Sequence, residues 1–300
     1  TSALQDKQTD IVATDAVKIL TSLKRLKARK KRIFFVGHHE GYVGPYFVRT
    51  VIRRLGFDDL GANCNSIIGP KMLSNIAFKK IANNIGNSFL VLPSQKYKPI
   101  KHEALKNHLT ELSICTQYLI KMPSSLQLLI ENFSYEKFIS IFSNLTENNT
   151  ELLVYNMSST TKKEALAYLG TLKKAQPFRT LNRSDYEKFL ELMYEPFLLF
   201  PEGSRSHILS DGTVQLKPVN PRYMPAFMRP GDIAVPVSLT GGHDALKGVF
   251  LRPAICGFSI GEPIEISSEM LRNYQIEGLD IMKKIAELPS LKKVIFTQTH

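Results

Sequence analysis

Apolar residues recur along the first part of the chain with two different spacings. Between residues 10 and 29 they repeat close to every 3.6 positions, which predicts an amphipathic helix. Residues 33–36, Ile-Phe-Phe-Val, form a continuous apolar run, which is typical of a strand buried on both faces of a parallel sheet. A glycine-containing turn with His38 and His39 follows, and residues 46–55 return to a helical pattern. We therefore expect a helix, a buried strand, a polar loop and a second helix in this order.

The alternation of strand-like and helical segments continues along the chain. A polar stretch at residues 144–151 is the best candidate for a linker. The alternation predicts an α/β protein with a mixed, mostly parallel central sheet flanked by helices. We expect an N-terminal amphipathic helix in residues 1–30, followed by a single α/β domain at 31–300 with a helical insertion at about 100–195. Further strands are predicted at residues 66–68, 89–92, 152–155, 198–200 and 233–237, and further helices at 72–84, 102–145 and 162–174.

Charge is the feature of the composition that stands out. The chain has 39 Lys and Arg against 27 Asp and Glu, a formal net charge of +12, which favours an anionic partner. No zinc-finger, RRM or helix-turn-helix signature accompanies that charge, so we expect no nucleic acid among the partners. The basic run at residues 24–31 suits the C-terminus of the first helix, or it faces an anionic phospholipid surface. A solvated basic surface explains the charge equally well.

Cysteine content and hydropathy restrict the compartment. Cys64, Cys115 and Cys256 are odd in number and far apart, which fits neither a disulfide framework nor a metal site, so a reducing compartment is favoured. No apolar run approaches the ~18 residues that a membrane-spanning helix needs. We expect a cytoplasmic protein, with any contact to an anionic membrane being peripheral.

The segment Phe200-Pro201-Glu202-Gly203-Ser204-Arg205-Ser206 combines several chemical properties in one loop. Gly203 permits a tight turn and a close approach of the backbone to a ligand, and the guanidinium of Arg205 matches a phosphate group. Glu202 fixes the loop or pairs with a basic neighbour. An acidic turn after a strand would explain the Pro, Glu and Gly, but it explains the whole string poorly.

This segment resembles the third sequence motif of the glycerol-3-phosphate and 1-acylglycerol-3-phosphate acyltransferase family, which usually reads Phe-Pro-Glu-Gly-Thr/Ser-Arg-Ser. Val235-Pro236-Val237, which begins 34 residues after Pro201, is similar to the family's fourth motif, an apolar strand containing proline. The resemblance covers residues 33–97 and 198–240, and it implies a glycerolipid acyltransferase-like fold.

The segment from His38 to Pro45 is similar to the family's first motif, His-x4-Asp, which follows a strand. When Pro45 is aligned with the proline that often follows this motif, His39 takes the place of the catalytic histidine and Gly44 that of the aspartate. The resemblance implies that His39 is the general base that removes the proton of the acceptor hydroxyl, with His38 as a less favoured alternative. The glycine leaves the aspartate's role of orienting the imidazole to another group. The candidates are Glu40, Glu202, Asp58, Asp59 and a backbone carbonyl.

The resemblance also implies an acceptor site and an oxyanion site. Residues 66–96 are similar to the part of the soluble plastid-type glycerol-3-phosphate acyltransferases that leads to a lysine-rich phosphate site. Backbone N–H groups near Gly203 are expected to stabilise the oxyanion of acyl transfer, with Glu202 counted among the catalytic residues. For each lysine, an exposed and solvated charge is an equally good explanation. The residues that the resemblance assigns to substrate binding are Lys96, Lys98, Ser204, Arg205 and His207.

Two functions remain open from the sequence. The first is an acyltransferase that moves a fatty acyl group from acyl-CoA or acyl carrier protein to the hydroxyl of glycerol-3-phosphate or a related phosphorylated acceptor, with no metal or organic cofactor. The second is a catalytically impaired protein on the same fold that binds acyl thioesters or anionic lipid, because Gly44 interrupts the His-Asp pair. A nucleic-acid-binding protein would account for the charge but not for residues 200–206.

Overall fold

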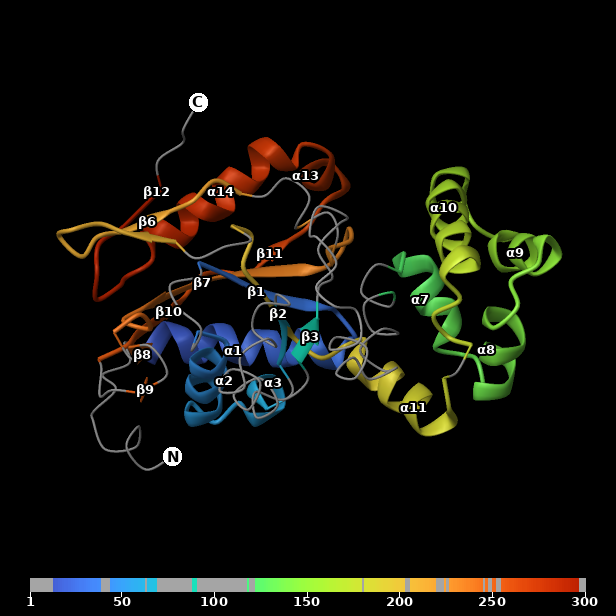
Figure 1. Ribbon diagram of the computed structural model, residues 1–300, viewed down its shortest axis with the longest axis horizontal. Coiled ribbons are helices and arrows are strands. Elements are labelled where there is room, and N and C mark those ends of the chain that lie inside the picture. The colour runs from blue at the N-terminus through green and yellow to red at the C-terminus, as the bar shows by residue number, and fades with distance from the viewer. Residues whose placement is uncertain are drawn as a thin grey trace. The chain divides into compact units, whose positions relative to one another are not determined.

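The chain divides into two compact units (Figure 1). Unit 1 comprises Thr1–Ser88 and Tyr194–His300, and unit 2 comprises Phe89–Met193, so the second unit is inserted between two parts of the first in the sequence. The computed structural model describes residues 13–38, 44–62, 64–68, 88–90, 118, 122–179, 181–202, 206–219, 224, 227–244, 246–247, 250–251 and 255–296.

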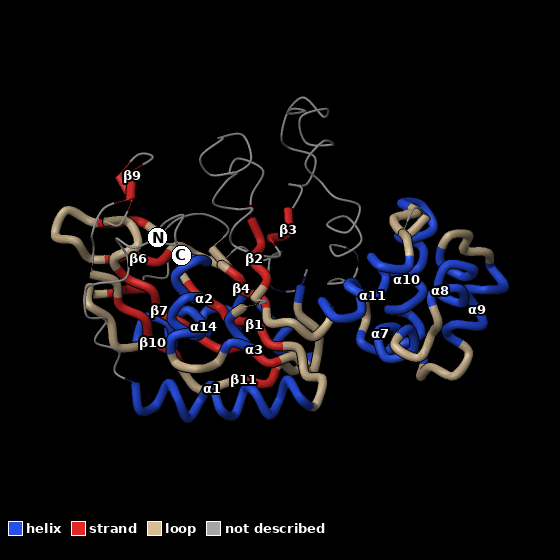
Figure 2. Tube along the Cα trace, turned by 90° about the horizontal axis from the view of Figure 1, so that it is seen from below, coloured by secondary structure: helices blue, strands red, loops and turns tan. Residues whose placement is uncertain are grey.

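In the part of the chain that the structure describes, the main sheet has seven strands, six of them in the order β10-β7-β1-β4-β2-β3, and β11 is also paired to β7 (Figures 1 and 2). The central strand β1 is parallel to both of its neighbours, β4 and β7, and β2 is parallel to β4. The strands β10 and β11 run antiparallel to β7. The predicted α/β class with a mixed sheet is therefore confirmed. The strands are β1 (Ile33–Gly37), β2 (Asn65–Ile68), β3 (Ser88–Leu90), β4 (Phe197–Leu199), β7 (Ile233–Thr240), β10 (Gly257–Ile260) and β11 (Ile264–Glu265).

Side-chain alternation along the central strands separates the two faces of the sheet. Ile33 and Phe35 of β1 and Val235 of β7 belong to a core cluster on one face. Three helices complete that cluster: α1 (Ala13–Ala28), α2 (Gly44–Arg54) and α3 (Asp58–Gly61). The buried apolar face of α1 packs into this core, through Ala16, Ile19, Leu20 and Leu23.

The opposite face of the sheet is covered by α14 (Tyr274–Glu287), which Figure 1 shows on the other side of β7 and β1 from α1. Phe34 of β1 stacks on Phe197 of β4 with ring centroids 5.2 Å apart, and both rings are buried. Ile281, Met282 and Ile285 of α14 are also buried. Because helices cover both faces, the central strands are apolar at nearly every position.

A second, smaller sheet has the order β12-β6-β5. The strand β5 (His207–Ile208) pairs antiparallel with β6 (Val214–Leu216), and β12 (Val294–Phe296) pairs with β6 in parallel. The remaining short elements of unit 1 are the β8 (Leu246–Lys247) and β9 (Phe250–Leu251) pair and the helix α13 (Ser268–Arg272). The small sheet thus joins the segment after residue 206 to the C-terminal part of the chain.

Unit 2 contains five helices among its described residues, grouped around aromatic side chains. Phe138 stacks on Phe142 at 4.6 Å between ring centroids and meets Phe178 edge-on at 5.2 Å. The buried Tyr186 donates a hydrogen bond from its hydroxyl to the carbonyl of Phe133, at 3.0 Å. The helices are α7 (Ser124–Ile130), α8 (Tyr135–Phe142), α9 (Glu147–Val154), α10 (Ser159–Ala175) and α11 (Arg183–Leu192).

Most of the predicted elements that fall on described residues are confirmed. The strands predicted at 33–36, 66–68, 198–200 and 233–237 correspond to β1, β2, β4 and β7, and the helices predicted at 46–55 and 162–174 correspond to α2 and α10. Of the strand predicted at 89–92, residues 89 and 90 belong to β3, and the rest lies outside the described residues. The helix predicted at 72–84 also lies outside them.

The strand predicted at residues 152–155 is wrong, and so is the linker at 144–151. These residues belong largely to α9, whose N-cap, Thr146, accepts a hydrogen bond from the Asn149 N–H at 3.2 Å. Leu153 and Val154 are both buried, whereas Leu152 is 78% exposed. Tyr155 is also exposed, so the two buried residues have an exposed residue on each side. That pattern fits one face of a helix, whereas a half-buried strand would alternate and a central strand would be buried throughout. The short apolar run is therefore the inner edge of a capped helix.

Candidate active site

The parallel strands β7, β1 and β4 deliver three sequence segments to the same edge of the sheet. The register pairs Gly37 with Val237 and Val36 with Leu199, so the carboxyl ends of the three strands are adjacent. In open α/β sheets, ligands bind outside the carboxyl ends of parallel strands. The segments that continue from these ends are the ones singled out from the sequence: the His38–His39 pair, the loop that starts at Phe200, and the end of the Pro236 strand.

Close packing fixes the end of β1 against its two neighbours. A methyl group added at Gly37 would lie 2.8 Å from Val237 Cγ2 and 3.8 Å from Phe200 Cε1. The first of these separations is shorter than a carbon–carbon contact allows, so the backbone reaches this position only without a side chain. Gly37 therefore brings the start of the histidine loop directly against β7.

His38 is fully buried where β1 ends. The backbone N–H of Leu239 donates to the Nε2 atom of His38 at 3.1 Å, and the hydroxyl oxygen of Ser238 lies 3.4 Å from the same nitrogen. Because Nε2 accepts the amide hydrogen, the neutral imidazole carries its own proton on Nδ1. His38 is thus held by β7. The adjacent His39, which the family resemblance makes the general base, lies outside the described residues.

Gly44 is the first residue of α2 and is buried. A methyl group at this position would lie 3.3 Å from Leu239 Cδ2 and 3.7 Å from Phe200 Cζ. A carboxylate at a helix N-terminus gains about 0.3–1 kcal/mol from the helix dipole. Burial of an unpaired carboxylate against apolar side chains costs more than that gain. Gly44, which the resemblance aligns with the family's aspartate, therefore lies in apolar surroundings that disfavour a carboxylate.

Glu202 is a buried carboxylate that closes the loop after β4. Its two oxygens accept from the Ser206 hydroxyl at 3.0 and 2.8 Å, and Oε1 also accepts from the Lys217 N–H at 3.0 Å. These bonds join the start of the loop to its end and to the residue that follows β6. The structure therefore gives Glu202 the role of fixing the loop, and a part in catalysis stays a prediction.

The other predicted site residues differ in how far the structure describes them. His207, in β5, is exposed and lies opposite Gln215 of β6, so it follows the Glu202 loop directly. Glu40, Lys96, Lys98, Gly203, Ser204 and Arg205 lie outside the described residues. Their assigned roles stay predictions from the resemblance.

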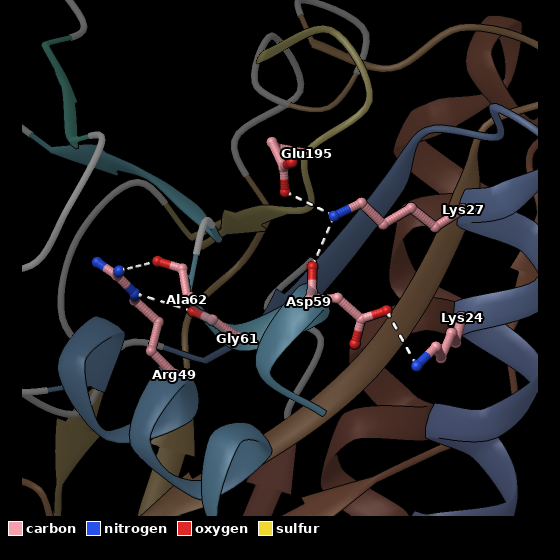
Figure 3. A network of polar contacts seen from close by, with 7 residues as sticks. All are labelled: Lys24, Lys27, Arg49, Asp59, Gly61, Ala62 and Glu195. Carbon is pink, nitrogen blue, oxygen red and sulfur yellow. Dashed lines mark hydrogen bonds and ion pairs between the residues drawn. The ribbon is translucent and has the colours of Figure 1, made fainter. Parts of the chain in front are cut away.

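Asp58 and Asp59 lie at the other end of the parallel strands, and Figure 3 shows Asp59 in a network of polar contacts there. The Asp59 carboxylate is 3.6 Å from Lys24 Nζ, and its carbonyl accepts from Lys27 Nζ at 2.6 Å. Lys27 Nζ also contacts Glu195 at 2.8 Å, just before β4 begins. Asp58 pairs with Arg53 at 2.9 Å. Neither aspartate is near His38, because β1 carries the chain to the opposite end of the sheet before His38, which argues against the hypothesis that Asp58 or Asp59 orients the imidazole of His39.

Acidic side chains also form ion pairs with three cations of the basic run at residues 24–31. Besides Lys24 and Lys27, Lys31 Nζ lies 3.1 Å from Glu265 Oε1. The next residue, Arg32, is buried, forms an ion pair with Asp232 at 3.6 Å and donates to the Phe227 carbonyl at 2.7 Å. This run therefore joins helix α1 to the beginnings of the parallel strands.

Cys64 is fully buried just before β2. Burial raises the pKa of its thiol to about 12, although the nearby Arg49 guanidinium acts in the opposite direction. A thiol with such a pKa is almost entirely protonated at neutral pH, and the thiolate is the reactive form.

Two contacts of the site could not be anticipated from the motifs: the Leu239 amide that binds His38, and the Lys217 amide that binds Glu202. Both donors are backbone groups, so no residue type signals them. Ser206, in contrast, is part of the recognised string and its hydroxyl marks a hydrogen-bonding position.

No protein-family model matches the sequence, and a comparison with curated proteins gives no match either. None of the helices in the described part of the chain combines the length and apolar character that crossing a bilayer requires.

Proposed function

We propose that the protein is an acyltransferase of the glycerolipid type, which transfers a fatty acyl group from a thioester to a hydroxyl of a phosphorylated acceptor. The observation that carries the proposal is the convergence of three segments at one edge of the sheet. Gly37 and Gly44 both lie against Phe200, the first residue of the family-like loop, and Gly44 also lies against Leu239, near the end of the Pro236 strand β7. Residues recognised separately in the sequence thus lie side by side in the fold, which supports the proposal.

In the proposed reaction, the imidazole of His39 removes the proton of the acceptor hydroxyl while the hydroxyl oxygen attacks the thioester carbonyl carbon. Backbone N–H groups near Gly203 stabilise the tetrahedral oxyanion. Collapse of the intermediate breaks the carbon–sulfur bond, and the imidazolium returns the proton to the departing thiolate. The products are an ester and the free thiol of CoA or acyl carrier protein.

Acceptor recognition is proposed for the cationic and polar side chains that the family resemblance assigns to substrate binding. Ser204 and Arg205 belong to the Glu202 loop, His207 follows it directly, and Lys96 with Lys98 come from the first half of the chain. Arginine suits this task because its guanidinium donates two parallel hydrogen bonds to a phosphate. The hydrogen bonds that close the Glu202 loop support the assignment, because they hold the two ends of residues 202–206 together.

Free thiol release from acyl-CoA or acylated carrier protein, measured with and without glycerol-3-phosphate, tests the proposal. We expect acceptor-dependent release by the wild type and a loss of about 10²–10⁴-fold in kcat for His39→Ala. Arg205→Ala should raise KM for the acceptor. Arg54→Ala is the matched control, because Arg54 is exposed in the last turn of α2. Equal background release by wild type and His39→Ala, with every acceptor tried, would contradict the proposal.

One observation favours a second function, the binding of acyl thioesters or anionic lipid without turnover. The place of the family's aspartate is packed against Leu239 and Phe200, so this motif supplies no carboxylate to the imidazole. Calorimetric titration with acyl-CoA distinguishes the two functions. Saturable binding by wild type and His39→Ala alike, with no thiol release, is the result expected of a binding protein.

The proposed compartment is the cytoplasm, with peripheral contact to an anionic membrane as part of the proposal. The ion pairs of Lys24, Lys27 and Lys31 reduce the charge that the basic run offers to lipid. Co-sedimentation with vesicles of neutral or anionic lipid tests the contact, and equal pelleting with both kinds of vesicle argues against it.

A further inference from the structure

The two described ends of the loop between β1 and α2 contact the same residue of β7. At the first end, the imidazole of His38 accepts the Leu239 N–H at 3.1 Å. At the second end, Gly44 lies so near the Leu239 side chain that an added methyl group would be 3.3 Å from its Cδ2 atom. Leu239 itself is 2% exposed, so both contacts are shielded from water.

The imidazole of His38 accepts a hydrogen bond from β7 just beyond the last backbone pair between β1 and β7. The last pair between β1 and β7 is Gly37 with Val237, so Leu239 lies beyond the end of β1. A buried backbone N–H needs an acceptor, and an unsatisfied one is destabilising. The His38 ring supplies that acceptor from a fully buried position. It therefore extends the attachment of β1 to β7 past the last paired residue.

We propose that His38 is a positioning residue. It anchors the start of the His39 loop to Leu239 and so fixes the point from which the chain continues to His39, the proposed general base. This inference rests on the proposed function for its effect on catalysis, whereas the anchoring itself does not. A displacement of about 1 Å at a reacting group lowers rates by about 10²-fold, so loss of the anchor should act mainly on kcat.

Three substitutions of His38 distinguish the effect of losing the hydrogen bond to Leu239 from the effect of altering a buried side chain. In His38→Gln the amide oxygen is as far from the backbone as Nε2 and can accept the Leu239 N–H. In His38→Asn the amide is one methylene shorter and does not reach, and in His38→Leu there is no acceptor. We expect about a 10²-fold loss of kcat in His38→Asn and His38→Leu with little change in KM for acyl-CoA, and recovery of most of the rate in His38→Gln.

Hydrogen exchange of the Leu239 amide is the second measurement, and it needs no activity. Exchange should be slow in the wild type and in His38→Gln and markedly faster in the other two variants, while amides of Phe34 and Phe35 in the middle of β1 stay protected. Ile281→Ala is the control for a general loss of stability, because Ile281 is buried on α14 and lies outside the core cluster that contains Leu239. It should leave kcat and the Leu239 exchange rate unchanged.

The outcomes are distinct. Wild-type rates in all three His38 variants, or equal loss in all three, overturn the proposal, as does slow Leu239 exchange in His38→Leu. If the wild type releases no thiol with any acceptor, the proposed function fails, and the exchange of Leu239 still decides whether His38 anchors the loop.

Discussion

The Glu202 carboxylate accepts a hydrogen bond from the backbone N–H of Lys217, fifteen positions later in the sequence, at 3.0 Å. The same carboxylate binds the Ser206 hydroxyl. One buried side chain thus ties the end of β4 to the loop and to the small sheet.

Removal of the Glu202 carboxylate should destabilise the protein. Glu202→Ala leaves the Lys217 N–H and the Ser206 hydroxyl without this acceptor, and we expect a loss of about 1–3 kcal/mol in the free energy of unfolding. Ser206→Ala removes one donor only, and should cost less. Urea unfolding of both variants and of the double variant measures the coupling. Strict additivity of the two effects would show that the bonds between Glu202 and Ser206 contribute nothing.

Gly44 should tolerate alanine better than aspartate. Alanine brings a methyl group to 3.3 Å from Leu239 Cδ2, a contact that a small shift of that side chain relieves. Aspartate brings a carboxylate to the same apolar place, and we expect Gly44→Asp to be less stable than Gly44→Ala by at least about 2 kcal/mol. Thermal unfolding of the two variants tests this. A stable Gly44→Asp protein with a raised kcat would instead show that a carboxylate fits there and orients the imidazole.

The buried thiol of Cys64 should cause the free energy of unfolding to fall as the pH becomes alkaline. Its folded pKa of about 12 exceeds the ordinary thiol value, so above that ordinary value the unfolded chain loses a proton that the folded chain keeps. The stabilisation is complete below about pH 8.5 and is lost progressively as the pH rises towards 12. Between pH 8 and 10 the wild type should therefore lose about 1–2 kcal/mol more than Cys64→Ala does, as measured by urea unfolding. Identical pH profiles would contradict a raised pKa.

Breaking the Arg32–Asp232 ion pair should strongly destabilise the protein. Both side chains are buried, at 4% exposure each, where β1 and β7 begin. Asp232→Asn leaves the guanidinium without its counter-charge, and we expect a loss of about 3–5 kcal/mol. Lys283→Ala, which removes an exposed pair with Asp280 at 3.3 Å, is the control and should change stability by less than about 1 kcal/mol. Chemical denaturation of both variants gives the comparison, and similar losses would argue against the buried pair.

The central strands were predictable from the sequence because burial on both faces leaves a continuous apolar run. Ile33 to Val36 and Ile233 to Val237 are such runs, and both are strands. The same kind of run at residues 152–155 is part of a helix, since four apolar residues do not distinguish a strand from the buried side of a helix. Thr146, which caps that helix, was the local signal against a strand.

The candidate site was predictable only as far as side chains carry the chemistry. The Glu202 loop and the histidine pair were found from residue types in order along the chain. The pairing of His38 with Leu239 depends on a register between strands some 200 positions apart, and the donor is a backbone amide that every residue but proline has. The ion pairs of the basic run depend on distant acids such as Glu195 and Glu265, so the sequence alone could not separate a structural run from a lipid-binding one.

The position of β1 between β4 and β7 has a consequence for how the chain folds. Phe34 pairs with Phe197, about 160 residues later, and with Ala234 beyond that, so the central strand is synthesised long before either neighbour. Closing such long loops is slow, and an apolar strand without neighbours is prone to aggregation. Nascent chains that end before residue 197 should therefore depend on chaperones to keep residues 33–37 from aggregating, and folding of unit 1 should be a late, post-translational event.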